Sequence, residues 1–332
     1  MMAKKLLYLL TLITLGVTTV FSQNRELVVK ENIPLDSIRL SDPFIIADKA
    51  TNMYYMTGTG GLLWKSKDLK LWTGPYRVAK PDPNSWMGKN PMIWAAELHE
   101  YQGKYYYFAT FTNRDVKIDT VRGNVLERRA CHILVSDKPD GPFVPMADPI
   151  YLPANKPTLD ATFWIEDKKP YMIYCGEWLL NWNGTVEKIQ LKPDLSGTIG
   201  EGKVLFRASE SPWSKEKQDG KIVPNKVTDG PYVFRTKTGR LGMIWTSWVY
   251  SVYTQGVAYS KSGKLDGPWM QESNPITPPD YGHGMLFQTL QGKWLMAVHS
   301  HKSINGHYLR VPHLFEVDLS GDKLIVGQPY MP

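Results

Sequence analysis

The sequence predicts an all-β protein, a five-bladed β-propeller with four-stranded blades around a central funnel. A short polar turn followed by a tight aromatic or aliphatic strand occurs five times. One residue marks the same position in each copy: Tyr54, Tyr105, Tyr171, Gly242 and Trp294. The intervals between these residues are 51, 66, 71 and 52 residues. These intervals are longer than a hairpin and close to the length of one four-stranded sheet, which is typical of a propeller blade.

A second repeat runs out of phase with the first. A Ser-rich polar turn leads to a Gly-Pro-aromatic step three times, ending at Gly74-Pro75-Tyr76, Gly141-Pro142-Phe143 and Gly267-Pro268-Trp269. The glycines are 67 and 126 residues apart, and the second interval is twice 63, so one blade between them lacks the motif. Turn chemistry of this kind also occurs in β-sandwiches, but two interleaved repeats with one period favour the propeller.

The first 22 residues have the pattern of an export signal. Lys4 and Lys5 precede the apolar run from Leu6 to Val20, and cleavage is expected after Ser22. A membrane anchor is the alternative, but the run is short and contains four threonines. We therefore expect residues 23–332 to form one catalytic domain, without a membrane span, that is periplasmic or secreted.

Composition excludes several other classes of function. The net charge is +7, but lysines and arginines are scattered, which argues against nucleic acid as a partner. The two cysteines, Cys131 and Cys175, each lie within an apolar strand pattern, so buried free thiols are favoured over one disulfide. There is no zinc-binding pattern and no nucleotide-binding glycine loop. A monomer is expected.

Three aspartates begin predicted innermost strands, where distant parts of the chain meet at the axis. They are Asp42 in Ser41-Asp42-Pro43-Phe44, Asp160 in Leu159-Asp160-Ala161-Thr162, and Asp229 in Thr228-Asp229-Gly230-Pro231. Any one of them alone fits a turn, but all three are expected to share one phase of the repeat. Hydrolysis of a glycosidic bond needs one ionised and one protonated carboxyl, and a third carboxylate raises the pKa of its neighbour.

These motifs resemble those of glycoside hydrolase family 43. The matching segments, in order, are Asp42-Pro43-Phe44, Trp94-Ala95-Ala96-Glu97-Leu98, Leu159-Asp160-Ala161-Thr162-Phe163, Asp229-Gly230-Pro231 and Gly282-His283-Gly284. The resemblance extends from Asp42 to the C-terminus and implies a five-bladed propeller with an inverting mechanism. It also implies that Asp42 is the general base and that Asp160 tunes the pKa of the general acid and orients it.

The general acid is where this sequence departs from the family pattern. The family usually has a glutamate directly before Gly-Pro, whereas this chain has Asp229, which is one methylene shorter. Glu177, in Cys175-Gly176-Glu177-Trp178, is expected to end the second strand of blade three and is the alternative acid. The simpler interpretation of Glu177 is a rim or turn glutamate.

Further residues are candidates for binding. His283 begins the fifth blade, and the resemblance implies a place for it near a central cation, so a structural calcium is an optional expectation. Trp94, Trp86 and Trp164 are candidates for stacking on a sugar ring, although propeller cores also use tryptophan. Arg310 fits a late funnel arginine that binds substrate hydroxyls, and a surface strand arginine is the alternative.

The sequence therefore predicts an exported glycosidase that needs no cofactor and removes terminal sugars from plant oligo- or polysaccharide by inversion. The expected sugar is α-L-arabinofuranosyl, otherwise β-xylosyl or galactosyl. Insertions at 80–92 and 113–129 are predicted to be rim loops that close the funnel into a pocket, which favours exo action. A non-catalytic carbohydrate-binding propeller is the alternative, and the three carboxylates argue against it.

Overall fold

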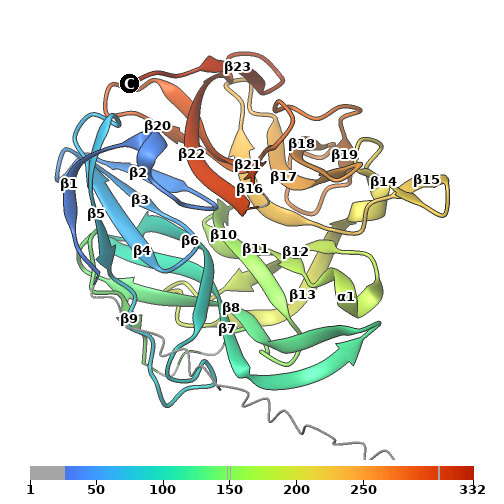
Figure 1. Cartoon of the computed structure of the whole chain (residues 1–332), viewed down its shortest axis with the longest axis horizontal. Helices are drawn as coiled ribbons and strands as arrows, with labels where there is room; N and C mark the ends of the chain where they lie inside the picture. The colour runs from blue at the N-terminus through green and yellow to red at the C-terminus, as the bar shows by residue number, and fades with distance from the viewer. Residues whose placement is uncertain (1–26, 148, 150, 306) are drawn as a thin grey trace, which may run out of the picture.

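The computed structural model describes residues 27–332 except 148, 150 and 306. The predicted export signal lies outside the described residues. The strands are arranged as five blades around a central axis, in chain order (Figure 1). The predicted five-bladed propeller is therefore confirmed.

Each blade is an antiparallel sheet of four strands, running outward from the axis. Blade one contains β2 (Phe44–Asp48), β3 (Met53–Thr57), β4 (Leu62–Ser66) and β5 (Leu71–Arg77), with β1 (Lys30–Pro34) added at its outer edge. Blade two contains β6 (Met92–Tyr101), β7 (Lys104–Val121), β8 (Asn124–Ser136) and β9 (Val144–Pro145). Blade three contains β10 (Thr158–Glu166), β11 (Lys169–Gly176), β12 (Thr185–Leu191) and β13 (Thr198–Arg207).

The last two blades are bridged to each other. Blade four contains β16 (Asp229–Arg235), β17 (Leu241–Val249), β18 (Val252–Ser260) and β19 (Trp269–Gln271). Blade five contains β20 (Tyr281–Gln288), β21 (Trp294–Ile304), β22 (His307–Asp318) and β23 (Ile325–Pro329). One bridge, Thr254 to Tyr281, joins them, and another attaches the hairpin of β14 (Lys215–Gln218) and β15 (Lys221–Pro224) to β17. The short helices are α1 (Trp178–Asn181), η1 (Leu35–Ser37) and η2 (Ala208–Glu210).

Both sequence repeats correspond to blade elements. The five polar turns lead into the second strand of each blade, β3, β7, β11, β17 and β21. The three Gly-Pro steps lie in or just before the outer strands β5, β9 and β19. The predicted phase of the two repeats is therefore confirmed.

The hydrophobic core consists of layers between neighbouring blades. Each of the five core clusters in the described part of the chain combines side chains from two adjacent blades. The layer between blades five and one, for example, includes Phe44 and Tyr54 with Phe287 and Leu295. Since a second strand packs on blades at both its faces, it reads as a continuous apolar run, which explains segments such as Met53–Thr57.

The ring closes between blade five and blade one. The backbone N–H of Leu40 donates to the carbonyl oxygen of Arg310 at 3.0 Å, and that of Leu290 donates to the Tyr54 hydroxyl at 3.0 Å. Cys131 and Cys175 are buried free thiols, as predicted. Among the described residues, no helix has the length and apolarity needed to cross a bilayer.

One backbone distortion recurs at the top of every innermost strand. A single residue per blade has a positive φ between 43° and 57°, at Asp42, Ala95, Asp160, Gly230 and His283. In blades two to five this residue lies within a β-bulge, and in blade one it precedes β2. Bulges re-aim side chains, and here they lie at one level around the axis.

Candidate active site

A cavity of about 440 Å³ opens at the funnel, over the bulges of the inner strands. It is lined by seven of the predicted site residues, Asp42, Trp94, Asp160, Glu177, Asp229, His283 and Arg310. The inner strands of four blades contribute four of these residues, and Asp42 lies just before the inner strand of the remaining blade, so the fold brings together positions that are up to 241 residues apart in the chain, from Asp42 to His283.

Asp42 is held by polar contacts on several sides. The Thr59 hydroxyl donates to its Oδ2 at 2.5 Å, and Nδ1 of His283 lies 3.2 Å from its Oδ1. Burial disfavours the charged carboxylate, but the surrounding polar groups, of which His283 has the largest effect, together outweigh it, and the pKa of Asp42 lies below its usual value. The side chain is therefore ionised at neutral pH, as a general base requires.

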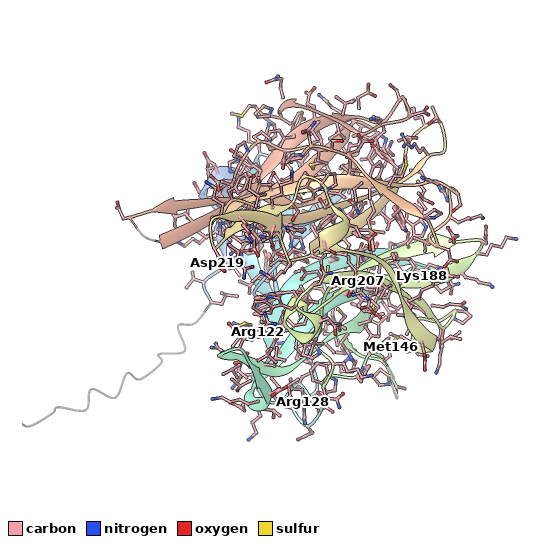
Figure 2. All side chains as sticks on the ribbon, turned by 90° about the vertical axis from the view of Figure 1, so that its right-hand side faces the viewer. Arg122, Arg128, Met146, Lys188, Arg207 and Asp219 are labelled. Atoms are coloured by element: carbon pink, nitrogen blue, oxygen red, sulfur yellow. The ribbon has the colours of Figure 1, made fainter. Side chains whose placement is uncertain are left out.

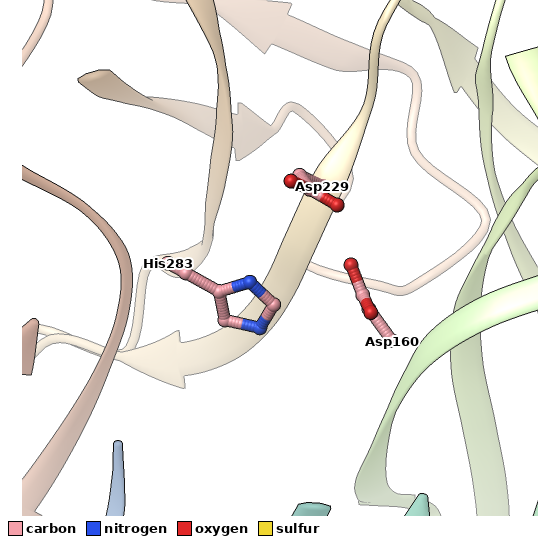
Figure 3. A group of neighbouring side chains, drawn as sticks. All are labelled: Asp160, Asp229 and His283. Atoms are coloured by element: carbon pink, nitrogen blue, oxygen red, sulfur yellow. The ribbon is translucent and has the colours of Figure 1, made fainter. Parts of the chain in front are cut away.

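Asp160 and Asp229 form a carboxyl pair. They come from the inner strands of blades three and four and face the His283 imidazole (Figure 3). A hydrogen bond joins the two carboxyls, the Gly230 N–H donates to Oδ2 of Asp160 at 3.1 Å, and the Tyr253 hydroxyl donates to Oδ2 of Asp229 at 2.9 Å.

The two carboxyls of this pair differ in acidity. Burial raises the pKa of Asp160 to about 6. Burial and the neighbouring Asp160 carboxylate together raise the pKa of Asp229 well above its usual value. Because two carboxyls this close cannot both ionise freely, Asp229 keeps the proton and Asp160 is the carboxylate that accepts its hydrogen bond. Asp229 is thus poised as a proton donor.

The predicted common phase of the three aspartates holds only for Asp42 and Asp160. In blade four the positive-φ position is Gly230, so Asp229 lies one residue earlier on its strand. The reason is steric, since a Cβ on Gly230 would lie 2.7 Å from the His283 ring. Asp229 still reaches the cavity because the residue before the bulge also lines it, as Trp94 and Leu159 do.

Glu177 also lies in the cavity, at the N-terminus of α1. Its Oε2 accepts from Nη1 of Arg129 at 2.8 Å, and the Arg129 guanidinium stacks over the Trp94 ring at 4.1 Å. Burial raises the pKa of Glu177, and the charge of Arg129 opposes that rise. Glu177 is therefore engaged with a cation, whereas Asp229 shares a proton with another carboxyl.

Arg310 also lines the cavity, as the sequence predicted for a funnel arginine. Its Nη1 donates to the Ser41 hydroxyl at 3.2 Å, and its Nη2 is 2.8 Å from Nε2 of His301. Part of the guanidinium remains directed at the cavity, where it can bind a substrate hydroxyl.

Two predicted stacking residues, Trp86 and Trp164, lie outside this cavity. Trp86 lines a separate cavity with Arg128 and His132. Trp164 is four residues beyond Asp160 on β10, about 13 Å further along the strand, and packs in the core between blades three and four. The prediction that these two side chains bind substrate in the funnel is wrong, and Trp94 alone of the three lines it.

Several cavity residues were not predicted from the sequence. They are Thr59, Arg129, Trp178, Trp248 and Tyr253. Most lie on second strands or inter-strand connections, where an aromatic residue looks like any core aromatic. Of these residues, only Thr59 could have been recognised from the sequence, because Thr110 and Thr246 occupy the same register position in other blades.

The residues around His283 do not suit calcium. One ligand atom each from Asp160, Asp229 and His283 lie within 4.8 Å of one another. Calcium prefers six to eight oxygen ligands, whereas this group offers one imidazole nitrogen and two carboxyls that share a proton. The imidazole is instead placed against Asp42.

A five-bladed propeller with an ionised carboxylate facing a carboxyl pair across one cavity has the catalytic groups of a glycoside hydrolase. The model of glycosyl hydrolases family 43 matches residues 32–323. The chain belongs to this family, so it is a glycosidase and its substrate is a carbohydrate.

Solved structures support the assignment. An endo-arabinase from Bacteroides thetaiotaomicron VPI-5482 is 34% identical, with 89% of this chain and 99% of that chain covered and a TM-score of 0.74. An endo-1,4-beta-xylanase from the same organism is 22% identical, covering 92% and 99% at a TM-score of 0.68. An alpha-L-arabinofuranosidase from Lactobacillus brevis is 17% identical, covering 90% and 98% at 0.64, and these last two likenesses concern the fold. A search of the curated proteins finds no match.

Proposed function

We propose that the protein hydrolyses α-L-arabinofuranosyl linkages of plant polysaccharide by inversion and releases terminal residues. The observation that supports this most directly is the division of labour between carboxyls: Asp42 is held ionised, while Asp229 retains a proton beside Asp160. The choice of sugar is supported by the 34% identity to an enzyme described as an endo-arabinase.

In this mechanism Asp42 removes a proton from a water molecule as it attacks the anomeric carbon. Asp229 transfers its proton to the departing glycosidic oxygen. The negative Asp160 raises the pKa of Asp229 before transfer and turns its carboxyl, while Tyr253 fixes the other oxygen. Trp94 offers an apolar face for the sugar ring, and Arg310 a donor for its hydroxyls.

Terminal action is proposed because the blade-three side of the cavity is walled. Trp178 and Leu179 of α1 line the cavity, and Trp182, directly after α1, packs on Trp178 with ring centroids 4.9 Å apart. The guanidinium of Arg122, on the β7–β8 hairpin, lies 3.9 Å over the Trp182 ring, and Figure 2 labels Arg122 on this hairpin. The insertion predicted as a rim loop at 113–129 is thus mostly strand.

Endo action on arabinan is the second candidate. The observation in its favour is the identity to the endo-arabinase, which is higher than that to the arabinofuranosidase. The family alone does not choose between the two modes.

We also propose that the protein is exported, on the pattern of residues 1–22, and acts as a monomer. Hydrolysis by paired carboxyls needs no organic or redox cofactor. Because the residues around His283 do not suit calcium, chelation is expected to leave most of the activity in place.

The deciding experiment is a panel of nitrophenyl glycosides followed by debranched arabinan. We expect cleavage of the α-L-arabinofuranoside, release of arabinose from the first minutes on arabinan, and the inverted anomer as the first product by proton NMR. Early release of mixed oligosaccharides would assign endo action. The retained anomer would exclude the mechanism, and no cleavage of any glycoside would favour a carbohydrate-binding propeller.

A further inference from the structure

At four of the five junctions, neighbouring blades are joined by the same hydrogen bond near the axis. The backbone N–H of a positive-φ residue donates to a side chain that lies on the second strand of the preceding blade or, for Thr59, two residues beyond it. Four junctions follow this pattern: Ala95 to Oγ1 of Thr59 at 2.9 Å, Asp160 to Oγ1 of Thr110 at 2.8 Å, His283 to Oγ1 of Thr246 at 2.8 Å, and Asp42 to Nδ1 of His299 at 3.0 Å.

The acceptors occupy one register position. Thr110 pairs with Trp94, Thr246 with Asp229 and His299 with Gly282, and each of these partners directly precedes its blade's positive-φ residue. By the same register, Cys175 holds this position in blade three, because it pairs with Leu159.

The junction between blades three and four differs. Its donor, the N–H of Gly230, bonds to Oδ2 of Asp160 at 3.1 Å. A thiol is a weaker hydrogen-bond acceptor than a hydroxyl or an imidazole nitrogen, so Cys175 competes poorly for this donor. The N–H that closes the other junctions is thereby available to a carboxylate.

We propose that Cys175 is a positioning residue for catalysis: its thiol fills the acceptor position without taking the Gly230 N–H, which therefore orients the Asp160 carboxylate toward Asp229. Cys175 is fully buried and reaches the substrate only through these groups. The inference rests on the proposed function in that Asp160 and Asp229 act as the catalytic pair.

The surroundings of Asp160 make this one donor important. The carboxyl groups of Asp229 and Asp42 face Asp160, and that of Glu97 lies nearby. The Arg129 guanidinium and the His283 imidazole lie on its other sides. Hydrogen bonds to a charged group are stronger than those between neutral groups. A rotated Asp160 would leave the Asp229 proton without its acceptor.

Two nearly isosteric variants separate this role from simple core packing. Cys175→Thr introduces the hydroxyl acceptor found at three other junctions, whereas Cys175→Val has the same shape and no acceptor. We expect Cys175→Thr to lower kcat roughly ten- to a hundred-fold with KM little changed, the range that one hydrogen bond to a charged group allows. Cys175→Val should retain kcat within about threefold, since its effect is confined to packing.

Crystal structures of the two variants provide a readout besides activity. In Cys175→Thr, the Gly230 N–H should donate to the threonine hydroxyl and the Asp160 carboxylate should turn away. If Cys175→Thr does not fold, Cys175→Ser supplies the same acceptor in a smaller side chain.

Equal kcat for the threonine and valine variants, or an Asp160 that keeps the Gly230 N–H in Cys175→Thr, would overturn the proposal. Failure of the proposed function looks different, because the wild-type protein would then hydrolyse none of the glycosides. The crystal structures decide the positioning role in that case too.

Discussion

The backbone N–H of Asp42 donates to Nδ1 of His299 at 3.0 Å, across 257 residues of chain. Because Nδ1 accepts, the imidazole proton lies on Nε2 and the ring is neutral, although Nδ1 is also 3.4 Å from Oδ1 of Asp42. Burial lowers the pKa of His299 to about 3, which agrees with the neutral form. One bond therefore joins the last blade to the first and fixes the backbone of the proposed base.

We expect His299→Leu to lower both the Tm and kcat, because it leaves the buried Asp42 N–H without an acceptor, at a cost of about 1–3 kcal/mol. His299→Asn places an oxygen at the position of Nδ1 and should preserve more of both. Thermal unfolding and kinetics of the two variants check this. A leucine variant as stable and active as the asparagine variant would contradict the role of the bond.

Replacing the proposed base should abolish turnover without unfolding the protein. Asp42→Asn keeps the size of the side chain but cannot accept a proton from water, so kcat is expected to fall by about 10² to 10⁴ or more. The control is the Tm, which should change little since Thr59 can still bond to the amide oxygen. Most of the wild-type kcat remaining in Asp42→Asn would exclude this residue as the base.

The identity of the acid can be read from leaving groups. Asp229→Ala should reduce hydrolysis of arabinan far more than that of a nitrophenyl arabinofuranoside, because nitrophenolate departs without protonation. Glu177→Ala removes the partner of Arg129 and should mainly raise KM, equally for both substrates. The reverse assignment follows if the leaving-group dependence appears in Glu177→Ala. If neither variant shows the leaving-group dependence, a carbohydrate-binding protein is favoured over an enzyme.

Glu97 predicts a pH dependence of stability. Burial raises its pKa to about 8, and Oε2 lies 2.8 Å from Nε2 of His99, whose pKa burial lowers to about 3, so the bond joins a protonated carboxyl and a neutral imidazole. The folded state thus holds a proton that the unfolded chain releases above about 4.5. This stabilisation is complete below pH 4.5 and is lost as pH rises through 8.

The measurement is the free energy of unfolding between pH 5 and 9. Glu97→Gln should flatten the alkaline decline by up to a few kcal/mol, because the amide does not titrate. Glu100→Gln, on the same strand and more exposed, is the control. A wild-type decline that survives unchanged in Glu97→Gln would show that other groups cause it.

The contact between Arg122 and Trp182 predicts an effect on the mode of action. Arg122→Ala should loosen the wall formed by α1 and increase the share of oligosaccharides among the early products of arabinan. Hydrolysis of the small nitrophenyl substrate should be unaffected. Arg114→Ala, on the same hairpin but paired with Glu127, serves as the control. Identical product profiles for both variants would exclude the wall as a determinant.

The sequence predicted the blades and most of the carboxyl groups that line the cavity because both depend on local patterns. The repeats set the strand order, and Asp42 and Asp160 each lie at or just before the start of an inner strand in the repeat. It misplaced Trp164 because alternation along a strand does not reveal how far a side chain lies from the axis. It missed Arg129 and Tyr253 because both reach the cavity from third strands, β8 and β18, where register depends on bulges and hairpin length.

Five residues with positive φ, one at the start of each inner strand, surround the funnel like the vertices of a pentagon. Two vertices hold aspartate, one histidine, one glycine and one alanine, all on one backbone conformation. Except at Gly230, where a Cβ would lie 2.7 Å from the His283 ring, exchanging the side chain at a vertex therefore changes the chemistry without a new loop or a shifted strand. Ala95 is the vertex with no functional group, and its N–H is already held by Thr59. An additional carboxylate or imidazole could be installed there on a backbone that already supports one in three other blades.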